Sequence, residues 1–249
     1  MGLVIIAVII ILIIMIVLVA RRQAGRRAVP GSGTVVSQIK PLEGFSRVNV
    51  GNAFHVEVKE SPQFSVSLSA DDNVIDLVEA EKEGDTLRIG LEAGDYKEVT
   101  LRARITMPEL RGVMLTGASR ASLEGFSSAN DLGISLSGAS VLEGYVEARE
   151  ADLRINGASK LTIAGSADNL SVRASGASVL DLQHFSIDRA SVVLDGASQL
   201  TVNVRGTIEL ARLTGSSTLL YDGEPDLGDI QTYGASRIEP RQGEEIPHS

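Results

Sequence analysis

The chain has 249 residues, of which 43% are apolar, and it contains no cysteine and no tryptophan. Residues 1–40 carry five basic and no acidic side chains, so the rest has 18 basic and 32 acidic ones, a formal charge of −14. This acidic body repels phosphate backbones and argues against nucleic acid as a partner. The lack of cysteine excludes disulfides, thiolate metal sites and thiol nucleophiles.

Residues 3–20 form an unbroken run of 18 apolar residues. A helix of this length spans about 27 Å, close to the hydrocarbon thickness of a bilayer. A cleaved signal peptide is the alternative, but its apolar region is shorter and follows a positive charge, whereas only Met1 and Gly2 precede this run. We therefore predict a single-pass transmembrane anchor over residues 1–22, which makes a membrane one partner of the chain.

Four arginines follow the apolar run: Arg21, Arg22, Arg26 and Arg27. The positive-inside rule retains such residues in the cytoplasm, which would place the following domain there too.

Residues 23–40 include Pro30 and three glycines and have little periodicity, so they are expected to form a flexible linker.

Residues 41–110 contain short segments in which apolar and polar residues alternate, as expected for strands with one buried face. Residues 74–80 and 87–91 flank a Glu-Gly-Asp turn and are expected to form a hairpin. We expect the region to hold earlier, less regular coils of the domain that follows.

A Gly-Ala-Ser triplet recurs through the second half of the chain. It occurs at residues 117–119, 138–140, 157–159, 176–178, 196–198 and 234–236, with the degenerate copy Gly215-Ser216-Ser217 in the gap. The spacings are 21, 19, 19, 20, 19 and 19 residues. A fixed period of this length is typical of a solenoid.

Apolar residues occupy like positions around each triplet. Two residues before each glycine stand Leu115, Leu136, Ile155, Ala174, Leu194, Leu213 and Thr232, and two after each serine stand Ala121, Leu142, Leu161, Leu180, Leu200, Leu219 and Ile238. The residue four positions before each glycine is also apolar, and the position between these two is variable. Each unit is therefore a strand, a corner, a second strand and a turn. We predict an all-β fold, a single-stranded right-handed parallel β-helix over residues 41–240, with a disordered tail over 241–249.

At these residues the chain resembles the bacterial and archaeal family of putative auto-transporter adhesins, head GIN domain. The resemblance rests on Phe45-x-x-Val48-x-Val50-Gly51-x-x-Phe54-x-Val56-x-Val58, then Gly84-Asp85-x-Leu87-x-Ile89, then the Gly-Ala-Ser repeats. It covers about residues 41–240 and implies a parallel β-helix at the cell envelope, on the outer side of the membrane. It implies no established activity. The side of the membrane thus stays open, because residues 21–27 favour the cytoplasm.

The acidic side chains give little indication of catalysis. Glycoside cleavage needs two carboxyl groups at a defined separation. Glu124, Glu143 and Asp181 follow triplets but are assigned to different columns, and Asp152, Asp195 and Asp229 are scattered in the same way. His55, His184 and His248 are far apart and share no motif. Acidic side chains that lie on a solvent-exposed face of the domain explain such a distribution.

The repeated serines are interpreted as architecture: Ser119, Ser140, Ser159, Ser178, Ser198, Ser217 and Ser236. A nucleophilic serine is a single residue beside a base, whereas these recur without a nearby histidine. We expect a corner ladder whose hydroxyl groups bond the turn backbone.

Two further clusters were weighed. Asp71-Asp72-Asn73 could bind a hard cation through its oxygens, but an acidic turn is the simpler interpretation. A column of Arg154, Arg173 and Arg212 is expected to pair with acids on neighbouring coils. We therefore assign no catalytic, cofactor-binding or metal site and predict no cofactor.

The sequence predicts a non-enzymatic membrane-anchored β-helix that acts in adhesion or as an envelope spacer, with an unknown protein or glycan surface as partner. The first alternative is a cytoplasmic scaffold that polymerises through the open ends of the β-helix, so self-association stays open. A polysaccharide-active enzyme is the second.

Overall fold

The computed structural model describes residues 28–127 and 130–241. The predicted anchor over residues 1–22 and the tail from residue 242 lie outside this range. Within it, no helix is both long and apolar enough to span a bilayer. The described chain is all-β apart from one short 3-10 helix, so the predicted fold class is confirmed at that level.

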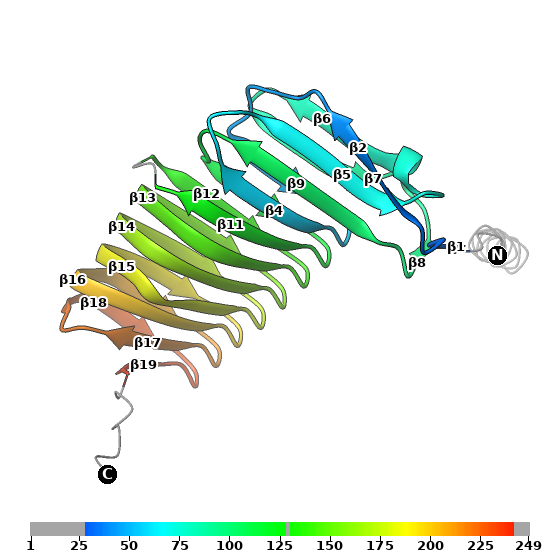
Figure 1. Cartoon of the computed structure of the whole chain (residues 1–249). Coiled ribbons are helices and arrows are strands. Elements are labelled where there is room, and N and C mark those ends of the chain that lie inside the picture. Colours follow the sequence, from blue (N-terminus) through cyan, green and yellow to red (C-terminus); the bar gives the residue numbers. More distant parts are fainter. Residues whose placement is uncertain (1–27, 128–129, 242–249) are drawn as a thin grey trace, which may run out of the picture.

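A solenoid of stacked coils forms the larger part of the molecule (Figure 1). Its strands are β3 (Arg47–Val50), β4 (His55–Glu60), β10 (Gly112–Leu115), β11 (Arg120–Phe126), β12 (Leu132–Leu136), β13 (Val141–Ile155), β14 (Lys160–Ala174), β15 (Val179–Leu194), β16 (Gln199–Leu213), β17 (Thr218–Asp222), β18 (Asp226–Thr232) and β19 (Arg237–Pro240). All pairings between these strands are parallel, as predicted. The right-handed sense stays a prediction.

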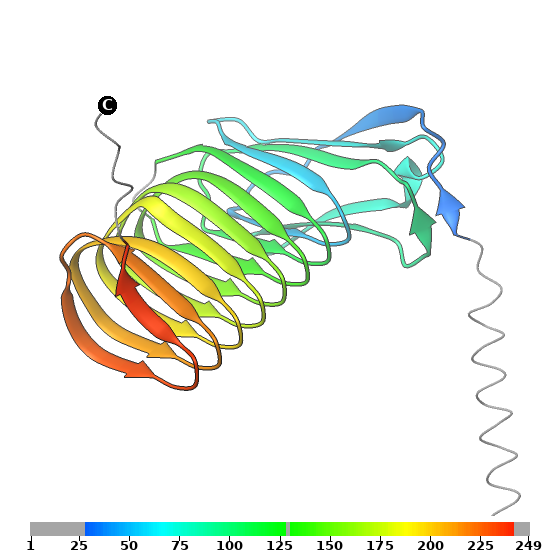
Figure 2. The ribbon, with the colours of Figure 1, turned by 90° about the horizontal axis from the view of Figure 1, so that it is seen from below.

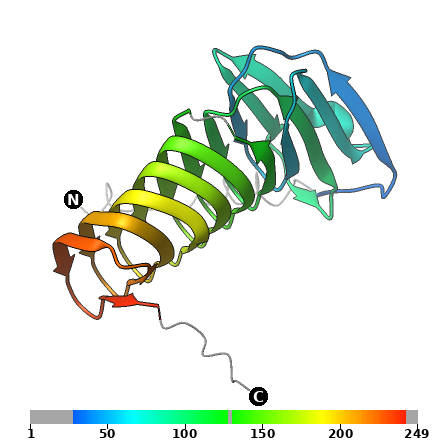
Figure 3. The same ribbon diagram turned by 60° about the vertical axis from the view of Figure 1, so that its left-hand side comes forward.

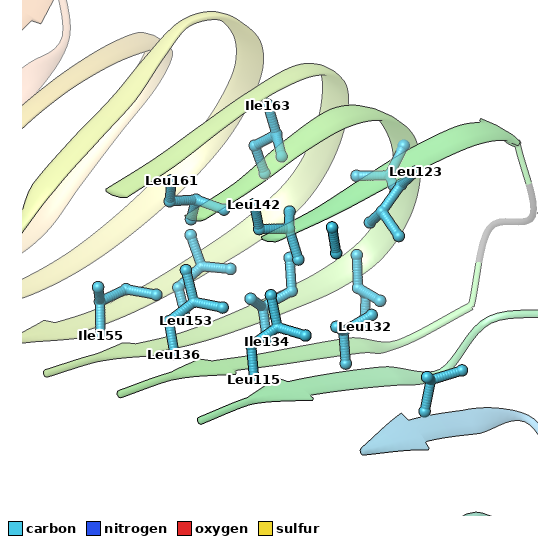
Figure 4. Packing of buried hydrophobic residues seen from close by; sticks show 14 of the residues in the cluster. Leu115, Leu123, Leu132, Ile134, Leu136, Leu142, Leu153, Ile155, Leu161 and Ile163 are labelled. Carbon is cyan, nitrogen blue, oxygen red and sulfur yellow. The ribbon is translucent and has the colours of Figure 1, made fainter. Parts of the chain in front are cut away.

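The register places like residues of the repeat directly above one another. Leu136 pairs with Leu115 and Ile155, and Leu142 pairs with Ala121 and Leu161. Alternate residues point inward, so the two walls of the solenoid bury facing rows of aliphatic side chains (Figure 4). The inward columns expected from the sequence are thus confirmed up to Leu213 and Leu219, whereas in the last coil Thr232 is exposed and Ile238 is partly buried.

Each Gly-Ala-Ser triplet forms a sharp corner. The corner glycines have φ between +74° and +85°, a backbone conformation that only glycine adopts without strain. The amide after each glycine donates to the carbonyl of the corner one coil earlier, as from Ala158 N to Gly138 O (2.8 Å). Repetition of this bond stacks the corners in a line, which is visible along one side of the solenoid in Figure 2.

The opposite side of the coil differs from the prediction of a second turn. β13, β14, β15 and β16 run through it as continuous strands of 15 or 16 residues. Register shifts interrupt the pairing there, for instance between Thr162 and Gly165. Such bulges bend a strand without breaking the sheet. The coils from β13 to β16 therefore have one tight corner and one continuous bend, which gives the flattened rings seen in Figure 3.

A cap of different topology closes the N-terminal end of the solenoid. It consists of β1 (Val29–Pro30), β2 (Val35–Lys40), β5 (Ser65–Asp71), η1 (Ile75–Leu77), β6 (Val78–Glu83), β7 (Thr86–Leu91), β8 (Tyr96–Lys97) and β9 (Leu101–Met107). One wall of the solenoid continues from β4 through β9 and β5 to β2, and the other continues from β3 through β7 to β6.

The cap corrects the prediction that residues 41–110 are earlier coils. Only residues 47–60 form a coil there, whereas β2–β5, β5–β9 and β6–β7 pair antiparallel. The alternation of residues was recognised correctly, but alternation alone does not distinguish parallel from antiparallel neighbours. The predicted hairpin at the Glu-Gly-Asp turn is confirmed as β6–β7.

The structure also differs from the prediction that residues 23–40 form a flexible linker. Residues 35–40 are strand β2, and residues 29–30 pair with β8. A clasp made of Asp71 and Asn73 fixes the segment between them. Asp71 accepts hydrogen bonds from Gly33 N (2.7 Å) and Thr100 N (2.6 Å), and Asn73 donates to Pro30 O (2.9 Å).

Candidate functional site

A groove crosses the outer face of the wall formed by β3, β10, β12, β13 and β14. Its main part has a volume of about 490 Å3, and an adjoining hollow of about 340 Å3 shares Arg47, Gly133, Asp152 and Arg154 with it. The two hollows together make one groove across this wall. It is the candidate site.

Two glycines form the floor of the groove. Register places Arg47, Gly112, Gly133 and Asp152 in one outward column, on four successive strands. The two glycines place no side chain between the charged residues at either end, whose backbones lie about 14 Å apart at a strand spacing of 4.8 Å. The side chain of Arg47 extends over Gly112, so the space is most open at Gly133. Gly133 has an ordinary backbone conformation, and a Cβ added there would meet nothing closer than Arg111 O at 3.9 Å. The hollow is therefore a consequence of missing side chains rather than of backbone strain.

Arginine–carboxylate pairs line the rim. Arg149 bonds both carboxylate oxygens of Asp131 (2.8 and 3.1 Å), while Arg111 bonds Glu109 and Arg154 bonds Asp152. The hydrogen bond that Arg149 donates to Asp131 raises the pKa of Arg149, and the one that Arg111 donates to Glu109 raises the pKa of Arg111. The rim therefore presents fixed donors and acceptors of both signs, which suits recognition of a polar ligand.

The carboxylates considered as catalytic candidates lie in columns of the sheet that differ from those predicted. Glu143 and Asp181 share one outward column, with Thr162 between them, and Asp152 and Asp229 share another. The interpretation that they lie in different columns was wrong: Glu143 and Asp181 each follow a corner serine by three residues, and Asp152 and Asp229 each precede a corner glycine by five. Glu124 pairs with Lys59 in a separate column (3.7 Å). Neither Glu143 nor Asp181 lines the groove.

The serine column is a structural ladder, as expected. Ser119, Ser140, Ser159, Ser178, Ser198 and Ser217 are buried. Each hydroxyl donates to the carbonyl three residues earlier, at 2.9–3.0 Å, as from Ser159 to Asn156 O. Ser236, in the last coil, has a buried Oγ without a hydrogen-bond partner among the described residues.

The remaining residues considered from the sequence do not converge. His55 lies on β4 and His184 on β15, and His248 lies outside the described residues. In the Asp71-Asp72-Asn73 turn, the side chains of Asp71 and Asn73 serve the clasp, and the described residues contain no group of three or more acids and histidines placed to hold a metal ion.

The predicted pairing of the arginine column across coils was wrong in two of three cases. Arg154 bonds Asp152 on its own strand and Arg173 bonds Ser171 on its own strand, because residues two apart share a face. Arg212 does bond across coils, but to the amide of Gln231.

One corner residue and the groove were not predicted from the sequence. Asn52 has φ +64° and its carbonyl accepts from Ala118 N, so it occupies the corner position of the first coil. A signal was present, because asparagine tolerates this conformation. The groove had no signal in the sequence, since the alignment of Gly112 with Gly133 has meaning only once the strands are paired.

Comparison with known families decides the assignment. The family of putative auto-transporter adhesins with a head GIN domain matches residues 44–225. The chain belongs to this family. The match includes the coil at residues 47–60, most of the cap and the groove, and it ends within the last coils of the solenoid.

Solved structures of similar fold come from Bacteroides and Parabacteroides species. A putative adhesin from Bacteroides fragilis is 14% identical, with a TM-score of 0.75 over 86% of this chain and 100% of that chain. A putative adhesin from Parabacteroides merdae (14%, 0.71, 86% and 99%) and a putative lipid binding protein from Parabacteroides distasonis (16%, 0.68, 87% and 100%) are similar too. At these identities the likeness shows the fold of the head GIN domain. No match was found among curated proteins.

Proposed function

We propose that the chain is a non-enzymatic, membrane-anchored recognition module of the cell envelope, which holds its groove away from the bilayer to contact a polar glycan or protein surface. The observation that supports this most directly is the groove itself, with its glycine floor and its rim of arginine–carboxylate pairs. A carboxylate in an arginine ion pair is positioned to accept hydrogen bonds, whereas glycoside cleavage requires one carboxyl group that keeps its proton.

The anchor is part of this proposal. The apolar run at residues 3–20 would span the bilayer, and the domain would lie on the outer side, as the adhesin family implies. Protease treatment of intact cells tests this placement. Cleavage of the domain without lysis is the expected result, and protection until lysis would contradict it.

A second candidate, a cytoplasmic polymerising scaffold, is favoured by the arginines at residues 21–27 and by the open C-terminal end of the solenoid. At that end β18 and β19 each have one paired edge only. Against polymerisation, Asp226 and Asp229 on β18 and Arg237, Glu239 and Pro240 on β19 are residues that discourage edge-to-edge association.

Recognition by the groove is tested by filling it. Fluorescent vesicles that carry the full chain are applied to an array of neutral and acidic bacterial glycans and to intact bacteria. The substitution Gly133→Gln projects a side chain into the groove from a backbone that accepts it. We expect at least roughly tenfold weaker retention, the equivalent of about 1.4 kcal/mol.

The matched control is Thr201→Gln, an outward residue of β16 on the other wall, which should bind as the parent chain does. Equal retention of vesicles with and without the protein on every surface would refute the recognition function. Turnover of any polysaccharide by the parent chain would replace it with an enzyme.

A further inference from the structure

Among the described residues, four strands of the large sheet have a neighbour on one edge only: β2 and β6 in the cap, β18 and β19 at the other end. Such edges invite association with other strands unless charges or proline protect them. β6 contains Glu79, Glu81, Lys82 and Glu83, and β18 and β19 are protected as described above. β2, with the sequence Val-Val-Ser-Gln-Ile-Lys, has only the terminal Lys40.

The edge of β2 is apolar as well as unprotected. Ile39 is 77% exposed, Val35 47% and Val36 36%, and Val29 on the adjacent β1 is 37% exposed. These are four of the nine large apolar side chains that the described surface exposes, and they occupy a stretch of eleven residues. Val35 and Ile39 lie on one face of β2 and Val36 on the other, so a partner that meets all three must approach the strand edge-on.

The position of this apolar edge in the chain indicates what covers it. Only residues 21–28 separate the apolar run at 3–20 from β1. Eight residues reach at most about 28 Å when fully extended. The clasp then holds residues 30–34 against the body through Asp71 and Asn73, so the chain enters the cap at a fixed point beside β2.

We propose that the apolar edge of β2 contacts the surface of the lipid bilayer, so that the cap rests on the membrane and orients the solenoid. This inference rests on the membrane anchoring proposed above. The short connection raises the effective concentration of the bilayer at β2, so even a weak contact is populated. Valine and isoleucine insert at the boundary between headgroups and acyl chains, and Lys40 and the preceding arginines attract anionic headgroups.

The absence of tryptophan from the chain provides a direct test, because one introduced tryptophan is the only one that fluoresces. The full chain carrying Ile39→Trp or Val35→Trp is reconstituted into vesicles of phosphatidylcholine and phosphatidylglycerol, with and without bromine on the acyl chains. Val179→Trp on β15 and Leu227→Trp on β18 are matched controls, since both residues are exposed and lie in the solenoid. We expect blue-shifted emission that brominated lipid quenches for the two β2 variants, and neither effect for the controls.

A second measurement avoids the intrinsic preference of tryptophan for membrane interfaces. The chain has no cysteine, so a spin label on Ile39→Cys is unique. Collisions with oxygen should exceed those with a water-soluble nickel chelate for this label, and the order should reverse for Val179→Cys.

The outcomes separate the two proposals. A chain that fails to float with vesicles on a density gradient refutes the anchor itself. A chain that floats while both β2 variants remain unquenched refutes only the contact of β2 with lipid. Quenching that disappears when each nanodisc holds a single chain would assign the β2 edge to a second copy and likewise overturn the bilayer contact.

Discussion

The solenoid and the cap share one hydrophobic core but are specified in different ways. In the solenoid from β10 onward, each strand pairs with the equivalent strand about 20 residues along the chain, and one corner residue per coil sets the geometry. In the cap, antiparallel strands meet across unequal separations, and the clasp joins Gly33 to Asp71 across 38 residues. A repeated unit needs only nearest-neighbour interactions, whereas the cap depends on contacts that each occur once.

Truncation of one leucine in each region is the strongest way to test this difference. Leu194→Ala in the solenoid and Leu68→Ala in the cap each remove a fully buried side chain, and each should lower the free energy of unfolding by about 2–5 kcal/mol. Hydrogen exchange should separate them. In the solenoid variant the protection lost should fade with distance from β15, whereas in the cap variant β2, β5 and β9 should lose protection together. Uniform loss in both variants would contradict the comparison.

Glycine substitutions give the next largest effect. A Cβ on Gly176 would lie 2.5 Å from Gly157 O at φ +85°, whereas Gly84 in the cap hairpin has φ +61° with nothing within 4 Å. Both alanine variants incur the strain of positive φ, but only Gly176→Ala also collides with the neighbouring coil. We expect losses of roughly 2–5 kcal/mol for Gly176→Ala and about 1–2 kcal/mol for Gly84→Ala in urea unfolding. Equal losses would show that the corners do not depend on close approach.

The clasp predicts a pH dependence of the stability of the cap. Hydrogen bonds from the amides of Thr100 and Gly33 lower the pKa of Asp71 below its ordinary value of about 3.9. The folded state therefore binds fewer protons than the unfolded one, so the stabilisation is fully present above about pH 4 and is lost as the pH falls through the folded-state pKa.

Asp71→Asn replaces one acceptor oxygen with an amide group that faces a backbone donor. The variant should have a melting temperature several degrees lower at pH 7, and it should lose less stability than the parent chain below pH 4. Asp72→Asn is the control, because Asp72 is exposed and only its backbone amide bonds Thr34 O. Parallel acid unfolding of the parent chain and the Asp71 variant would contradict the assignment.

The serine ladder should show the smallest effect. Ser159→Ala removes a buried hydrogen bond to Asn156 O and should cost about 1 kcal/mol. Ser236→Ala removes a hydroxyl from the same column that has no partner among the described residues, so its cost should be near zero. A cost for Ser236→Ala as large as that for Ser159→Ala would mean that the hydroxyl contributes through packing rather than bonding.

The solenoid could be predicted from the sequence because its information is repeated. Leu115, Leu136 and Ile155 occupy the same place in successive units, so inward direction and neighbours follow from the spacing alone. The bulged bend could not be predicted in the same way. Bulges alter the register by one residue or more without a fixed residue type, as between Thr162 and Gly165.

The cap and the groove could not be predicted for related reasons. Residues 35–40 lack strict alternation, and their pairing with β5 depends on residues 66–71, far along the chain. The groove exists because two glycines, 21 residues apart, lie side by side between charged residues of two further strands. Both features arise from single non-local contacts, which leave no pattern in one sequence.

The stacked corners have a consequence for how this molecule can change over generations. Each coil meets its neighbours through the same corner bond and the same inward columns, so a coil gained or lost by recombination leaves matching surfaces behind. The length of the solenoid can therefore vary in steps of about 4.8 Å, with the cap and the terminal coil unchanged. The distance that the solenoid spans can therefore change between relatives without any new interface. Relatives should differ in the number of coils more readily than in the structure of the cap.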